Sequence, residues 1–194
     1  MGLAMMILGL VLFIGIHVVT TRRDLRARLI GIGGDAVYKI AYAVLAIAGL
    51  LLIGYGFGTY RADGMIVLWH PPRWTRHVTE ALMLPAAILL AAAYARGRIY
   101  RAVKHPMLTA VKLWATAHLI ANGDLGSIIL FGSLLAWAVY DRISLKRRSD
   151  PGGPPIPVGG PKNDLIAVVA GIVLYLALGF LFHPYVIGVP VFGA

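Results

Sequence analysis

The stretch KHPMLTAVKLWATAHLIANGD, residues 104–124, decides the fold class because it is long and apolar, yet it holds two lysines and two histidines. Residues 107–122 have the composition of a membrane span, although Lys112 and His118 lie well inside them and His105 lies just before them. Lysine at the centre of a bilayer costs about 2.5–3.5 kcal/mol on insertion scales. Each of these polar side chains therefore requires an explanation.

The rest of the chain is equally apolar. Of its 194 residues, 59% are hydrophobic and 13% are charged, and the mean hydropathy is +0.80. A soluble domain averages about 25% charged residues, so the composition predicts that lipid is the main solvent. The chain has no cysteine, which excludes disulfides, iron–sulfur clusters and thiolate metal sites.

We predict an all-α fold, a polytopic transmembrane bundle of six spans, because a helix needs about 20 mainly apolar residues to cross a bilayer. We expect residues 1–194 to form a single membrane domain. The Pro/Gly-rich residues 149–161 are expected to be a flexible cytoplasmic linker before the last helix. The six predicted spans are Leu3–Thr20, Val37–Gly58, Thr79–Ala95, Met107–Asn122, Gly126–Tyr140 and Leu165–Phe182.

Lysines and arginines fall mainly on one side of these spans. The far side holds Arg61, Arg73 and Arg76, against thirteen basic residues in the first, third and fifth connections. Cytoplasmic connections collect such residues, so both termini are expected to face away from the cytoplasm. Topology thus explains the net charge of +10, and no nucleic-acid partner is expected. The thirteen are Arg22, Arg23, Arg26, Arg28, Arg96, Arg98, Arg101, Lys104, Arg142, Lys146, Arg147, Arg148 and Lys162.

Three histidines, His17, His105 and His118, lie in or beside the predicted spans. In one interpretation they are structural, each imidazole bonding a neighbouring carbonyl or hydroxyl. In a second, two of them are axial ligands of haem, and basic residues lie near its propionates. In a third they relay protons, although such relays normally also use carboxylates. The residues alone leave these alternatives open; the basic candidates are Lys112, Arg101 and Lys104.

Three further histidines, His70, His77 and His183, lie near the other ends of the spans. Together with Glu80 they would supply enough ligands for zinc. Their spacing matches no metal-binding motif, so we expect them to sit at the interface, where water is available. Lys39, at the end of the second span, is expected to extend its amine to the interface.

Several runs of residues are distinctive: KHPM (104–107), VKLWA (111–115), AHLIANGD (117–124), LAWAVYDRISLKRR (135–148) and WHPPRW (69–74). Tyr38-Lys39, with the apolar helix that follows, is a further such run. These runs resemble the NnrU family of integral membrane proteins. The resemblance covers nearly the whole chain and is densest from Lys104 to Asp124.

The resemblance implies a function that composition does not. The NnrU family takes its name from bacterial denitrification clusters, which implies a bacterial inner-membrane protein. It is similar to plant zeta-carotene isomerase, a membrane enzyme that uses histidine-ligated haem b to isomerise a cis double bond. This similarity implies redox or isomerase activity, an apolar polyene or lipid-like substrate, and haem ligation by His17 with either His118 or His105. Lys112 is then a candidate partner of a propionate. The alternative is a non-catalytic accessory or assembly protein with structural histidines.

Overall fold

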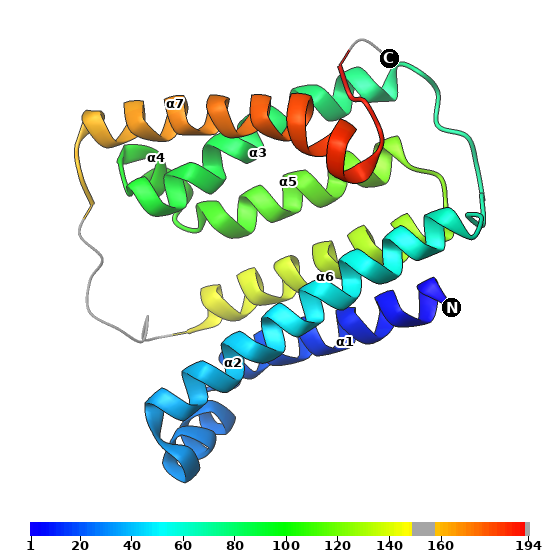
Figure 1. Cartoon of the computed structure of the whole chain (residues 1–194). Helices are drawn as coiled ribbons and strands as arrows, with labels where there is room; N and C mark the ends of the chain where they lie inside the picture. Colours follow the sequence, from blue (N-terminus) through cyan, green and yellow to red (C-terminus); the bar gives the residue numbers. More distant parts are fainter. Residues whose placement is uncertain (149–157, 193–194) are drawn as a thin grey trace. The chain divides into compact units, whose positions relative to one another are not determined.

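The computed structural model describes residues 1–148 and 158–192, and the regular secondary structure of these residues is helical apart from one isolated bridge between Val67 and Asp124 (Figure 1). The all-α prediction is therefore confirmed. Most of the predicted linker at 149–161 lies outside the described residues. Pro161, at its end, already begins a helix, as expected for a residue that fits the first helical position.

Five helices of the described residues are long and apolar enough to cross a membrane, so the prediction of six spans is not confirmed. The fourth predicted span corresponds to α5 (Pro106–Ala121), which has 16 residues. At 1.5 Å per residue it is about 24 Å long, shorter than the roughly 30 Å hydrocarbon core. The five are Gly2–Thr21, Arg23–Ala62, Thr75–Ala95, Leu125–Arg147 and Pro161–Ile187.

The chain divides into two compact units, and no finding tests the prediction of a single membrane domain. Unit 1 comprises Met1–Trp69 and Asp124–Arg147, with helices α1 (Gly2–Thr21), α2 (Arg23–Ala62) and α6 (Leu125–Arg147). Unit 2 comprises His70–Gly123 and Arg148–Ala194. Its helices are α3 (Thr75–Ala95), α4 (Arg98–Val103), α5, α7 (Pro161–Ala177) and the π-helix η1 (Leu178–Ile187).

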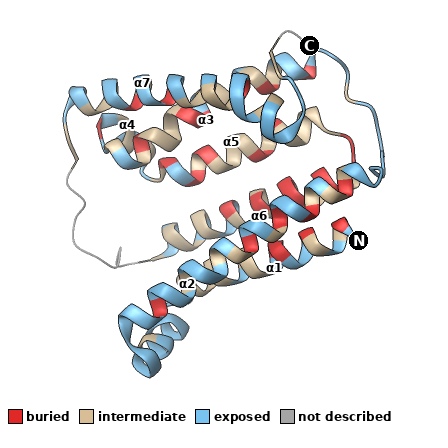
Figure 2. Cartoon of the chain, viewed as in Figure 1, coloured by how far each residue is buried: buried red, intermediate tan, exposed pale blue. Residues whose placement is uncertain are grey.

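Glycines let α1 and α2 of unit 1 pack backbone against backbone, and Figure 2 marks buried residues on both helices. A Cβ atom on Gly9 would lie 2.6 Å from the backbone nitrogen of Ile53, and one on Gly49 would lie 2.8 Å from that of Phe13. Both distances are shorter than van der Waals contact, so only hydrogen fits there. Apolar helices in lipid gain little free energy from burying apolar surface, because lipid is itself apolar. Close approach of the two backbones instead stabilises the helix pair by dispersion contacts.

The start of α6 is fixed to the rest of unit 1 by polar contacts. The Tyr60 hydroxyl of α2 accepts hydrogen bonds from the backbone N–H groups of Ile66, at 2.9 Å, and Gly126, at 3.2 Å. Asp124 accepts from the Ser127 backbone N–H at 2.9 Å and from the Ser127 hydroxyl at 2.6 Å. These bonds satisfy donors at a helix N-terminus that would otherwise lack a partner.

Unit 2 is held together by a similar combination of small residues and polar bonds. The buried Thr79 hydroxyl of α3 lies 2.9 Å from the carbonyl oxygen of Ala117 on α5. A Cβ on Gly171 of α7 would meet the backbone of Ile88 on α3, so these helices also approach closely. The first turn of α7 is tied to the first turn of α4, where the Asp164 carboxylate accepts a hydrogen bond from the Ile99 N–H at 2.9 Å.

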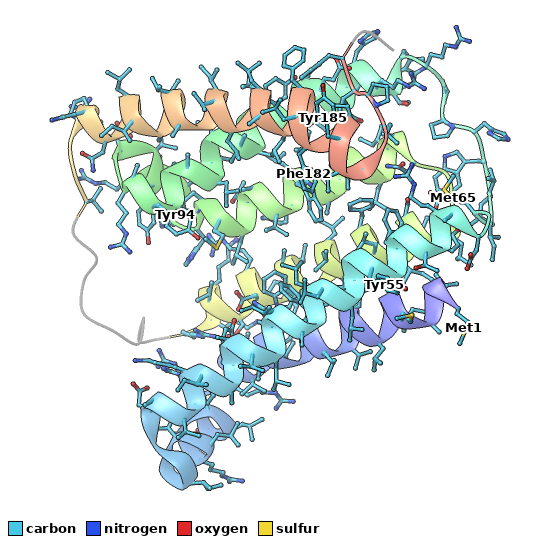
Figure 3. All side chains as sticks on the ribbon, viewed as in Figure 1. Met1, Tyr55, Met65, Tyr94, Phe182 and Tyr185 are labelled. Carbon is cyan, nitrogen blue, oxygen red and sulfur yellow. The ribbon has the colours of Figure 1, made fainter. Side chains whose placement is uncertain are left out.

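Large apolar and aromatic side chains cover the outside of both units. Tyr55 of α2 is 67% exposed and Tyr185 of η1 is 82% exposed, and both are marked in Figure 3. The residues that are fully buried are mostly small, as Ala92, Ala115, Ala117 and Ala138 illustrate. Large apolar side chains outside and small ones inside are typical of helices that face lipid. The described residues therefore have the character of a membrane protein.

The glycine contact between α1 and α2 predicts a site-specific sensitivity to a single methyl group. Gly9→Ala should destabilise the protein by about 1–3 kcal/mol, because its Cβ meets the α2 backbone. Gly54→Ala is the matched control, since a Cβ at Gly54 meets nothing within 4 Å. Unfolding of the purified protein in mixed micelles of rising SDS fraction measures both. Equal midpoints for the two variants would contradict the close packing.

Candidate functional site: the helix histidines

His17 lies on α1 within an aromatic cluster of unit 1. Its Nδ1 is 2.6 Å from the carbonyl oxygen of Phe13, one turn earlier. Three rings surround the half-buried imidazole. The ring centroids of Phe13, Trp137 and Tyr42 lie 4.2, 5.2 and 5.3 Å from that of His17. Helices α1, α2 and α6 thus each contribute an aromatic side chain that holds this imidazole in one orientation.

Two buried donors without partners lie in the same cluster. The Trp137 indole nitrogen and the Tyr38 hydroxyl are buried and make no hydrogen bond with any described residue. The Tyr38 ring lies 6.4 Å from that of Tyr42, and the Trp137 ring packs on His17. A buried donor left unsatisfied costs about 1–3 kcal/mol. This part of unit 1 therefore fits a bound group that carries hydrogen-bond acceptors. Both residues lie in runs that resemble the NnrU family, but the sequence did not predict that their donors would be unpartnered.

His118 lies on α5 of unit 2 and has a histidine neighbour that the sequence did not predict. The ring centroid of His183, on η1, is 6.2 Å from that of His118, and the two ring planes are inclined by 25°. His118 Nδ1 is 2.8 Å from the Trp114 carbonyl oxygen. The predicted position of His183 at the membrane interface stays a prediction. His183 lies within η1, a π-helix, which is a rare conformation that is common at functional sites.

His105, just before α5, and Lys112, within it, are both half-buried and belong to unit 2. His105 is the N-cap of the helix, as its position before Pro106 predicted. Its carbonyl oxygen accepts a hydrogen bond from the Thr109 N–H at 3.1 Å. Each unit therefore holds part of the predicted ligand set, with His17 in unit 1 and His105, Lys112 and His118 in unit 2.

The outer histidines do not assemble into the ligand set of a zinc site. His70 and His77 are exposed, and His77 Nδ1 lies 3.7 Å from the Glu80 carboxylate. Within residues 1–148 and 158–192, no three His, Asp or Glu side chains are grouped so that they would hold a metal ion. His183 is near His118 rather than grouped with His70, His77 and Glu80.

A common tautomer follows for three of the helix histidines. His17, His118 and His183 each place Nδ1 within 2.9 Å of a backbone carbonyl oxygen, which only accepts hydrogen bonds. Nδ1 must therefore carry the proton, and in the neutral ring Nε2 carries the lone pair. Histidines that ligate metals usually donate their second ring nitrogen in this way, because the bond fixes the orientation of the ring.

The comparison with protein families gives one match. The family model described as NnrU protein matches residues 5–191. The chain belongs to the NnrU family. Neither the comparison with curated proteins nor the comparison with solved structures found a match. In this NnrU-family chain the matched region contains all the helix histidines and the Tyr38–Trp137 cluster.

The tautomer of the three imidazoles is testable by NMR. We expect the ¹⁵N spectrum of histidine-labelled, haem-free protein in detergent at about pH 8 to contain the Nδ1–H form from His17, His118 and His183. Replacing each histidine by alanine assigns its signal. His70, which is exposed, serves as the internal control and should show the mixture of tautomers seen in water. Nε2–H forms at the three helix positions would contradict the hydrogen bonds described.

Proposed function

We propose that this NnrU-family membrane protein binds haem b, with His17 as one axial ligand and His118 or His105 as the other. The observation that carries the proposal is the aromatic cluster of His17. It holds an imidazole whose Nε2 lone pair is available in the neutral ring, beside the unpartnered Trp137 and Tyr38 donors. Haem ligation requires a neutral, oriented imidazole, and propionates are acceptors for such donors.

When bound, haem b would supply a redox-active iron able to transfer single electrons or to polarise a double bond as a Lewis acid. The residues of the chain have separate tasks around it. The Phe13 carbonyl orients His17, and the rings of Tyr42 and Trp137 exclude water from one side of the imidazole. If haem is bound, Lys112, half-buried on α5, would offer a positive charge to a propionate.

Redox or cis–trans isomerase activity linked to bacterial denitrification is the activity we propose. The helices are covered by apolar side chains, so an apolar polyene or lipid-like substrate would approach through the bilayer rather than through water. The distribution of arginines and lysines supports a multi-pass protein of the bacterial inner membrane with both termini in the periplasm.

The alternative is a non-catalytic accessory or assembly protein, and one observation favours it. Each of the three imidazoles bonds a carbonyl of its own helix, which already satisfies one ring nitrogen. A structural histidine would make the same bond. The two functions differ at Nε2. A bound iron would occupy this atom in the haem protein, and no iron would bind it in the accessory protein.

The optical spectrum of detergent-purified protein separates these functions. We expect a Soret band that is lost or shifted in His17→Ala and in either His118→Ala or His105→Ala, because each change removes a ligand to iron. Added imidazole should restore the band, since it replaces the missing ligand without repairing any structural contact. His70→Ala, at an exposed position, is the matched control and should keep the full spectrum.

The same variants test the additional imidazole in unit 2. His183→Ala should alter the spectrum only if the ring that neighbours His118 takes part in ligation. A folded wild-type protein that purifies without haem and does not change the spectrum of added hemin would overturn the haem proposal. Given a haem-bound protein, conversion of a cis-polyene then distinguishes an isomerase from an electron carrier.

A further inference from the structure

We propose that unit 1 binds one anionic phospholipid in a groove between the end of α1 and the first turns of α2. This groove is called the arginine groove below. It measures about 550 Å³, which is within the roughly 300–1,000 Å³ of sites that hold small molecules. The site involves none of the proposed haem ligands and does not depend on haem binding.

The first part of α2 is a short basic helix with its own direction. Gly34, at φ 81° and ψ 163°, interrupts the helix, and only glycine adopts this conformation readily. Residues 23–33 therefore turn away from the long apolar part of α2 (Figure 1). Between residues 22 and 28 the sequence RRDLRAR has four arginines and one aspartate. This excess of positive charge favours an anionic ligand.

The arginine groove has an apolar wall. Gly15, Val18 and Val19 of α1 line one side, and Leu25 of the basic helix, 43% exposed, lines the other. A Cβ on Gly15 would meet nothing within 4 Å, so the helix surface is open at this point. The wall belongs to the last two turns of a helix that is long enough to span the bilayer. An acyl chain fits against such a surface, since no polar side chain of α1 lies on it.

Arginines lie at the rim of the same groove. Arg22 and Arg28 line it and are exposed, and neither forms an ion pair with a described residue. A guanidinium group matches the two oxygens of a phosphodiester with two parallel hydrogen bonds. Asp24 also lines the groove, and its carboxylate offsets one of the two charges. The remaining charge, with Arg23 and Arg26 on the same helix, still attracts an anion.

The position of the groove selects a lipid rather than a soluble anion. The arginines follow directly after a 20-residue apolar helix, so they lie where the headgroups of a leaflet begin. Basic segments beside a span gain about a factor of five in affinity for anionic lipid per arginine. An apolar wall next to paired guanidinium groups fits a phosphate that is attached to an acyl chain.

Native mass spectrometry of the delipidated full-length protein tests this proposal. Phosphatidylglycerol and phosphatidylcholine with the same chains are added separately, and the bound lipid is counted. We expect one phosphatidylglycerol to bind in clear preference to phosphatidylcholine. The double variant Arg22→Gln/Arg28→Gln should weaken that binding about 25-fold, because two guanidinium groups are removed. The matched control Arg73→Gln/Arg76→Gln removes the same charge from exposed positions elsewhere and should bind as the wild type does.

A second variant tests the shape of the groove independently of its charge. Gly15→Leu should exclude the lipid because its side chain fills the open space, whereas Gly54→Leu, with equally open surroundings, should not. Helical content from circular dichroism confirms that each variant is folded. Glycerol phosphate should not compete with the lipid, since it lacks an acyl chain. Equal binding of both lipids, unchanged binding in both test variants, or full competition by glycerol phosphate would each overturn the proposal.

Discussion

The hydrocarbon core of a bilayer offers no hydrogen-bond partner, so each polar group on a membrane helix has to be satisfied by the protein itself. The chain meets this constraint by local bonds. His17 and His118 each donate Nδ1–H to a carbonyl of the preceding turn, and Thr79 bonds a carbonyl of the neighbouring helix α5. Where the constraint is not met, at Tyr38 and Trp137, a missing partner is implied. The proposed haem site follows from that imbalance.

Residues 104–124, where the resemblance to the NnrU family is densest, meet the same constraint at the ends of two helices. Pro106 begins α5 where a backbone donor is not needed, and the Asn122 side chain bonds the His118 carbonyl, at 2.8 Å, where the helix ends. Asp124 then caps α6 through Ser127. The segment therefore ends one helix and begins the next with its polar side chains bonded locally.

Composition, charge and apolar length were sufficient to predict an all-helical membrane protein and the approximate place of five spans. The bounds predicted for the fourth span, Met107–Asn122, agree with α5 to within one residue, but a helix of 16 residues is shorter than the hydrocarbon core, so its place among the spans is not confirmed. The contact between Gly9 and the α2 backbone was also beyond prediction. In an apolar run, a glycine can contact another helix, as Gly9 does, or have open surroundings, as Gly54 does. Only the packing of the two helices distinguishes these positions.

The candidate site was predictable in part. The resemblance drew attention to His17 and His118, and the structure places both half-buried in helices with defined partners. The sequence did not predict the contact between His183 and His118. The two residues are far apart in the chain, and their contact depends on how η1 packs against α5. The pairing of Trp137 with His17 likewise joins residues 120 positions apart. Contacts of this kind depend on helix packing, which the pattern of one sequence does not specify.

Low-temperature electron paramagnetic resonance of the ferric, ¹⁵N-histidine-labelled protein tests the central claim most directly, because it reports which atoms bind the iron. If buried imidazoles present Nε2 to a haem, the spectrum is that of low-spin iron, with couplings to two histidine nitrogens. The coupling from His17 disappears in His17→Ala. A high-spin signal with no histidine coupling, from a protein shown to contain haem, would contradict the claim that the polar groups of these helices are arranged to hold it.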